Sequence, residues 1–152
     1  FRRVLFRSEI FVHRNIANVV VHTDLNCLSV IQYAVEALQV SYIIICGHYG
    51  CGGVKASMDD NQYGLLDNWL RHIKDVRRFN QEKLEGLPEE EQVDLLCELN
   101  VKEQFNNVCE SSIVQRAWAN GSKLTVYGII YSIDNGILKS LCARNKDGEL
   151  SA

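Results

Sequence analysis

The chain has 152 residues and a mass of 17.3 kDa, with 47% hydrophobic and 23% charged residues, the composition of one ordinary globular domain. A chain of this length buries roughly 70% of the surface that it exposes when unfolded, so stability alone requires neither a metal nor a disulfide. Sixteen Lys and Arg residues against 19 Asp and Glu residues argue against a general nucleic-acid or anionic-membrane binder. A small neutral or anionic substrate suits this charge balance better.

The cysteines do not have the pattern of a disulfide framework, because their spacings are irregular and no secretory signal is recognisable. There are six of them: Cys27, Cys46, Cys51, Cys97, Cys109 and Cys142. Several occupy apolar positions, where a free thiol behaves as a small hydrophobic group. No apolar run approaches the roughly 18 residues of a membrane span. We therefore expect a cytoplasmic protein without membrane or nucleic-acid partners, whose cysteines point to metal binding or catalysis.

The first eight residues, Phe1 to Ser8, differ in character from the rest of the chain. They contain three arginines and lack the apolar core of a signal peptide. The same peptide is encoded by a nucleotide string that resembles the end of a common sequencing-library adaptor. We therefore expect residues 1–8 to be a non-native, adaptor-derived segment, and residues 9–152 to form a single domain. The alternative is a basic amphipathic leader.

The first third of the chain predicts a strand, a helix, a second strand and a glycine-rich loop. Residues 10–13 are a short β-favouring run, and Thr23 or Asp24 can cap a helix whose apolar residues recur through residue 38. Residues 42–46 are a continuous apolar run, typical of a strand buried on both faces, and residues 47–53 follow as the loop. This order favours an α/β fold with a parallel sheet.

The rest of the chain predicts three further helices and two strands. Helical spacing extends over residues 65–76, and Pro88 followed by three glutamates begins a helix that reaches residue 109. Ser111 or Ser112 caps another helix through residue 118. Residues 124–133 are β-like, and a turn at 134–136 leads into a strand at 137–141. No internal repeat or second domain boundary is visible.

His48 and Cys51 lie three residues apart in the loop at the carboxyl end of a predicted strand, where open α/β sheets place their ligands. His and Cys are ordinary zinc ligands, but catalytic zinc normally has three protein ligands. Cys46 is expected in the core, and no other cysteine has a reason to converge on the pair. A phosphate-binding loop is disfavoured, since the segment matches neither common glycine-rich phosphate motif. Four glycines allow the tight turn that shapes the site: Gly47, Gly50, Gly52 and Gly53.

Four segments together resemble a bacterial-type β-class carbonic anhydrase: residues 9–18, 22–29, 43–53 and 96–100. The stretch Cys-Gly-His-Tyr-Gly-Cys-Gly-Gly at 46–53 is the most specific of them. The resemblance implies a zinc-dependent lyase that interconverts carbon dioxide and bicarbonate, a mostly parallel sheet flanked by helices, and a full-length homodimer or homotetramer. It also implies that His48 and Cys51 are two of the three protein ligands of Zn²⁺.

The resemblance is incomplete on the N-terminal side. The family's third ligand is a cysteine in a C-x-D-x-R motif, on a strand that precedes the segment at 10–15, and residues 1–8 contain no such motif. We therefore expect a truncated domain that lacks the N-terminal helices, the first and central strand, and the motif's Asp–Arg pair. Such a fragment is expected to bind zinc weakly and to be inactive in hydration.

Arg14 and Tyr131 match positions that in some bacterial relatives form a regulatory bicarbonate site together with an upstream tryptophan. Structural roles compete with this interpretation, since Arg14 can bond loop carbonyls and Tyr131 can pack within a strand. An alternative function also stays open. The chain can be a non-catalytic α/β module whose Cys/His loop has a structural or thiol-redox role.

Overall fold

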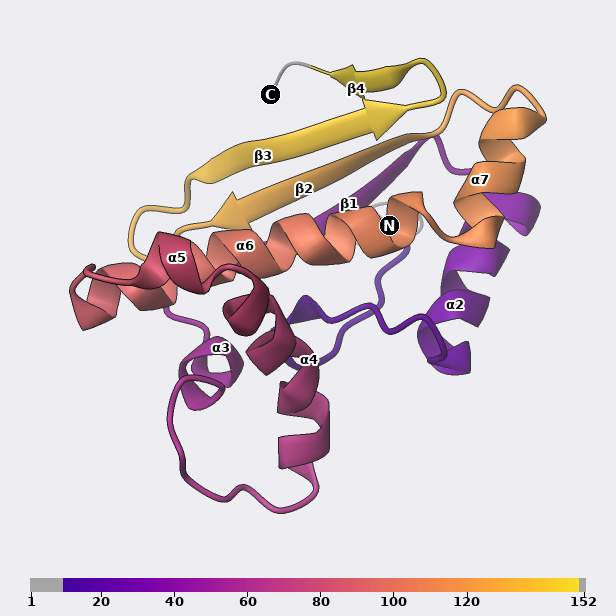
Figure 1. Ribbon diagram of the computed structural model, residues 1–152. Coiled ribbons are helices and arrows are strands. Elements are labelled where there is room, and N and C mark those ends of the chain that lie inside the picture. The colour runs from indigo at the N-terminus through magenta and orange to yellow at the C-terminus, as the bar shows by residue number, and fades with distance from the viewer. Residues whose placement is uncertain (1–9, 151–152) are drawn as a thin grey trace, which may run out of the picture.

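The computed structural model describes residues 10–150, so the predicted adaptor-derived segment at residues 1–8 lies outside it. No helix within these residues is long and apolar enough to cross a membrane. Figure 1 shows the elements, which are, in chain order, η1 (Ile16–Asn18), α2 (Leu25–Gln32), η2 (Tyr33–Ala37), β1 (Tyr42–His48), α3 (Gly52–Ala56), α4 (Leu66–Phe79), α5 (Gln81–Leu84), α6 (Glu89–Cys109), α7 (Ser112–Ala119), β2 (Thr125–Tyr131), β3 (Leu138–Asn145) and β4 (Gly148–Leu150).

The sheet has the order β1-β2-β3-β4, and α6 runs beneath it in Figure 1. β1 and β2 are parallel, with Tyr42 opposite Thr125 at one end and His48 opposite Tyr131 at the other. The pairs β2–β3 and β3–β4 are antiparallel. The predicted α/β class with flanking helices is confirmed. Within the described residues, however, the sheet is mixed rather than mostly parallel, because the turn after β2 sends β3 directly back along it.

The predicted helices are confirmed with small shifts of their bounds. Asp24 caps α2 by accepting a hydrogen bond from the Asn26 amide at 3.0 Å, and the helix continues as η2 to Ala37. Pro88 lies one residue before α6, whose first turn carries three glutamates at the positive end of the helix dipole. Ser111 caps α7 through the Val114 amide at 3.3 Å. Each of these boundaries follows from a local capping signal.

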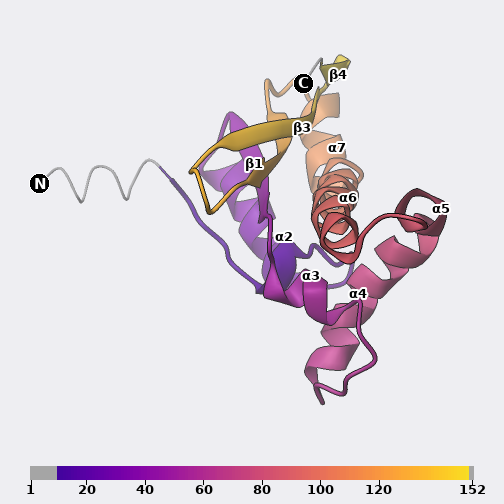
Figure 2. The ribbon, with the colours of Figure 1, turned by 90° about the vertical axis from the view of Figure 1, so that its left-hand side faces the viewer.

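Helix α6 is the central helix of the core. On one side it packs with α3 and α4 in an apolar cluster that includes Leu70, Ile73 and Leu96. On the other side Val101 and Phe105 pack with β1, β2, α2 and α7. Figure 2, in which α6 is seen nearly end-on, shows it between the sheet and α4. A helix enclosed in this way also buries polar side chains, and these need partners inside the protein.

Two buried side-chain amides of α6 supply such partners and hold residues 17–20 against the helix. Asn100 Nδ2 donates to the Ala17 carbonyl at 2.8 Å, and Gln104 Oε1 accepts from the Val20 amide at 2.8 Å. Gln104 Nε2 also donates to Asn100 Oδ1 at 3.0 Å, so each amide orients the other. Because these bonds satisfy the backbone, the buried Val19 and its neighbour Val20 lie in an ordered segment that is not a strand.

Three predictions about strand residues are wrong. Residues 10–13 form no strand, because within residues 10–150 no strand lies beside them, and the side chains of 10–12 are 50–64% exposed. β1 is buried on one face only, since Tyr42 and Ile44 on its other face are 64% and 58% exposed. Cys46 shares that face and is exposed rather than part of the core. β1 pairs with β2 alone, so the described residues leave its second edge and its outer face uncovered.

Replacing Gln104 with leucine should destabilise the protein by about 2–4 kcal/mol, because the Val20 amide and Asn100 lose their buried partner. Urea denaturation measures the free energy of unfolding. Gln81→Leu is the matched control, since Gln81 is exposed and bonds only Glu85, and it should change that free energy by less than about 0.5 kcal/mol. Equal effects of the two substitutions would contradict the role of Gln104.

Candidate metal centre

His48 and Cys51 stand at the two ends of a tight turn that joins β1 to α3. His48 is the last residue of β1, and Cys51 is the N-cap of α3, with its carbonyl accepting from the Lys55 amide at 2.9 Å. Between them, the Tyr49 amide donates to the Tyr131 carbonyl of β2 at 3.0 Å. The turn is therefore tied to regular structure on both sides, which fixes where its two predicted ligands leave the backbone.

The glycines around the turn have different roles. Gly50 has a φ of +66°, the left-handed conformation that a side chain disfavours. A Cβ on Gly47 would collide with Val101 of α6, and one on Gly53 would lie 2.9 Å from Ile16 Cγ2. A Cβ on Gly52 would meet no atom within 4 Å. The turn thus needs glycine at three of the four predicted positions, once for its conformation and twice for close packing.

One nitrogen of the His48 ring contacts the backbone of the turn. Its Nδ1 lies 2.9 Å from the Tyr49 carbonyl oxygen, which can only accept a hydrogen bond, so Nδ1 carries the hydrogen. The neutral ring then has its lone pair on Nε2, as a metal ligand requires. Cys51, the second predicted ligand, is 6% exposed and unpaired. The turn therefore offers one imidazole and one thiol, a donor pair that suits zinc in type.

The described residues do not supply a third ligand. No group of three or more His, Cys, Asp or Glu side chains in residues 10–150 is arranged to hold a metal ion. Cys97 of α6 is buried in the same apolar cluster as Cys51, and burial raises the pKa of the Cys97 thiol to about 12. In number, the donors are one short of a catalytic zinc site.

Tyr49 belongs to a hydrogen-bond chain that the sequence did not predict. Its hydroxyl donates to Glu98 Oε1 of α6 at 2.5 Å, and Lys139 Nζ of β3 donates to the same oxygen at 2.9 Å. Burial alone would raise the pKa of Glu98, but the bonds from Tyr49 and Lys139 outweigh it and hold that pKa below its usual value. Burial and the bond to Glu98 raise the pKa of Tyr49. Both groups therefore keep the charge states that this bond requires.

In the described residues, no hydrogen bond links Arg14 and Tyr131, the two residues of the predicted regulatory bicarbonate site. Tyr131 ends β2 directly opposite His48, and its carbonyl holds the Tyr49 amide, so it has a structural role beside the turn. Arg14 is exposed. The regulatory role of this pair stays a prediction.

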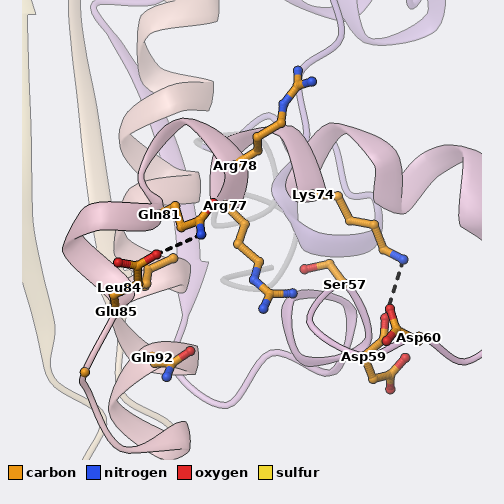
Figure 3. A pocket seen from close by; sticks show the side chains of 11 residues that line it. Ser57, Asp59, Asp60, Lys74, Arg77, Arg78, Gln81, Leu84, Glu85 and Gln92 are labelled. Carbon is orange, nitrogen blue, oxygen red and sulfur yellow. Dashed lines mark hydrogen bonds between the residues drawn. The ribbon is translucent and has the colours of Figure 1, made fainter.

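A cleft of about 500 Å³ lies elsewhere on the protein, among α4, α5 and the chain that follows α3 (Figure 3). None of residues 47–53 lines it. Arg77 Nη1 donates to the Met58 carbonyl at 3.0 Å and Lys74 Nζ to the Asp59 carbonyl at 3.5 Å, so its cations already have partners. The histidine and thiol of the turn therefore lie outside this cleft. The charges that line the cleft balance one another: Lys74, Arg77, Arg78, Asp59, Asp60 and Glu85.

The turn's sequence and geometry agree with the comparison to known families, in which the carbonic anhydrase family model matches residues 6–138. The chain belongs to the carbonic anhydrase family. A carbonic anhydrase of Emericella nidulans is 42% identical over 135 residues, which make up 88% of this chain and 59% of that protein. One of Saccharomyces cerevisiae is 31% identical over 147 residues, or 91% of this chain and 66% of that protein. The chain thus spans about three fifths of these two curated relatives.

Solved structures assign the chain to the β class. The Coccomyxa β-carbonic anhydrase in complex with acetazolamide superposes with a TM-score of 0.84 and 42% identity, over 87% of this chain and 60% of that one. A β-carbonic anhydrase of Sordaria macrospora, one of two described as tetrameric, superposes with a TM-score of 0.83 and 39% identity. The match covers 88% of this chain and 68% of that one. The resemblance to the β class, and the α/β fold with flanking helices that it implied, are confirmed.

Two glycine substitutions test how closely the turn is packed. Gly47→Ala should destabilise the carbonic anhydrase chain by about 1–3 kcal/mol, because the new methyl group meets Val101 and the Asn18 side chain. Gly52→Ala should change stability by less than about 0.5 kcal/mol, since the space beside Gly52 is open. Chemical denaturation of both variants measures the difference. A Gly52 variant as unstable as the Gly47 variant would contradict this packing.

Proposed function

We propose that this chain carries the His/Cys part of a zinc site for the reversible hydration of carbon dioxide to bicarbonate. The observation that carries the proposal is the turn between β1 and α3, on which His48 presents Nε2 and Cys51 presents a thiol. When bound, zinc supplies acidity, because it lowers the pKa of water from 15.7 to roughly 7. The chain's own contribution is to hold the imidazole in the ligating tautomer and to offer a thiolate that offsets the metal's charge.

We further propose that the third ligand comes from outside the described residues, in a segment that lies along the uncovered edge of β1. Two unsatisfied features support this proposal. β1 has a strand neighbour on one side only, although it leads directly to His48. Asn18 Nδ2 is the buried side-chain donor without a partner in residues 10–150, and Asn18 lies against Gly47 on β1. Buried polar groups in native proteins normally have partners, so a segment placed there would satisfy both.

We propose that the complete protein assembles as a homodimer or homotetramer. The relatives from Sordaria macrospora are described as tetrameric. In this chain, Tyr42 and Ile44 are exposed on the uncovered face of β1, and the exposed Phe11 and Tyr33 form a ring pair with centroids 5.9 Å apart. Exposed apolar groups gathered in this way are typical of an interaction surface.

The two ligands can be tested by zinc competition with a chromophoric chelator. The chain should bind zinc weakly, and His48→Ala or Cys51→Ser should each weaken binding by at least about tenfold, because each removes one donor. Cys46→Ser is the matched control, since Cys46 is an exposed thiol only two residues from His48. Zinc binding that survives Cys51→Ser but fails in Cys46→Ser would refute the ligand assignment.

The catalytic proposal is tested by completing the site. The chain alone should show no hydration of carbon dioxide above background in a stopped-flow pH assay. A chimera that adds the N-terminal part of the Emericella nidulans relative should bind one zinc per chain and gain activity. The same chimera with Cys51→Ser is the control and should stay inactive. Full activity of the unextended chain would contradict the proposal, as would a folded, zinc-loaded but inactive chimera.

A further inference from the structure

Helix α6 contacts the turn between β1 and α3 through Glu98, which accepts the hydroxyl hydrogen of Tyr49. The neighbouring Cys97 is buried in the same apolar cluster as Cys51. Glu98 and Tyr49 are 49 residues apart in the sequence, so this contact exists only in the folded chain. The turn is thus braced from α6 as well as from β1 and α3.

The partial burial of the Glu98 carboxylate costs solvation energy. Its side chain is only 18% exposed, and a carboxylate withdrawn from water is unfavourable unless hydrogen bonds compensate for the lost solvation. Lys139 supplies one such bond from the surface, where its side chain is 60% exposed. Tyr49 supplies the other from the turn. A charged acceptor makes the tyrosine bond stronger than a bond between two neutral groups, and its 2.5 Å length agrees with this.

The bond to Glu98 bears on the His48 ring through Tyr49. Tyr49 is held at two points, by its hydroxyl on Glu98 and by its amide on the Tyr131 carbonyl. These two attachments hold Tyr49 in place, and the Tyr49 carbonyl accepts from His48 Nδ1 at 2.9 Å. The partner of the second ring nitrogen determines which nitrogen of a histidine is free for a metal, and outer partners of this kind commonly alter metal affinity by about 10–100-fold.

We propose that Glu98, acting through Tyr49, is a positioning residue that holds His48 in the Nδ1–H tautomer with Nε2 free. Lys139 keeps the Glu98 carboxylate in place. Within residues 10–150 the Glu98 carboxylate bonds only Tyr49 and Lys139, so its effect on the His48 ring passes through Tyr49. The resulting chain of contacts runs from β3 through α6 to the turn.

Nitrogen-15 NMR of the histidine rings in the 152-residue chain tests this directly. In the unsubstituted chain, His48 should be in the Nδ1–H tautomer. In Tyr49→Phe, the ring should move toward the Nε2–H form that free imidazole prefers, and Co²⁺ affinity should fall about tenfold. In Glu98→Gln, which keeps an acceptor oxygen but loses the charge, the change should be intermediate, with Co²⁺ affinity about threefold lower.

Tyr63→Phe is the matched control. Tyr63 also donates its hydroxyl to a carboxylate, Asp59 Oδ2 at 2.8 Å, but in an exposed loop after α3, so neither readout should change. A folded Tyr49→Phe chain with the original His48 tautomer and unchanged Co²⁺ affinity would overturn the proposal. If Tyr49→Phe fails to fold, the nearly isosteric Glu98→Gln decides, and an unchanged tautomer there overturns it equally.

Only the Co²⁺ measurement rests on the proposed zinc role of His48, since the tautomer is measured without metal. A chain that binds no metal but shows the expected tautomer changes would contradict the proposed function and support the positioning role. The opposite result, metal binding with a tautomer that is indifferent to Glu98, would keep the function and remove the positioning role.

Discussion

The paired amides of Asn100 and Gln104 on α6 are the constraint on which the rest of this structure depends. They bind the backbone at Ala17, in η1, and at Val20, which follows it, and hold this segment in a path that is not a strand. Ala17, like its neighbour Asn18, has a positive φ, an arrangement that costs about 1–3 kcal/mol per residue and persists only where surrounding contacts enforce it. Gly53, at the start of α3, packs against Ala17. The position of the turn between β1 and α3 therefore follows from how α6 holds residues 17–20, which precede α2.

Helix α6 also contacts the turn between β1 and α3 directly. Within about one turn of α6, Glu98 bonds Tyr49 of the loop, and Val101 packs against Gly47 near the end of β1. A 21-residue helix is stiff over this distance, so it fixes the separation between the clamped segment and the loop. Preorganisation of this kind matters for a metal ligand, because a ring already held in the ligating tautomer loses little freedom when the metal binds.

Features with local causes could be predicted from the sequence, and features that depend on distant partners could not. Caps and turn residues predicted the helices, and the spacing of His48 and Cys51 at the end of an apolar run predicted the turn. A strand's burial depends on its neighbours, so the apolar run of β1 did not reveal that one face is open in the described residues. The hydrogen bond from Tyr49 to Glu98 joins residues 49 positions apart, and the sequence around either residue does not predict it. The segment 96–100 was singled out only by its resemblance to a family.

The central claim is that the turn contributes one imidazole and one thiolate to zinc, and that nearby Cys46 and Cys97 do not take part. X-ray absorption spectroscopy of the zinc-loaded chain counts the sulfur atoms bound to the metal. The account predicts a single sulfur, lost in Cys51→Ser, together with an imidazole and light water-like ligands. Two or more sulfurs per zinc in the unextended chain, or a single sulfur that persists in Cys51→Ser, would contradict it.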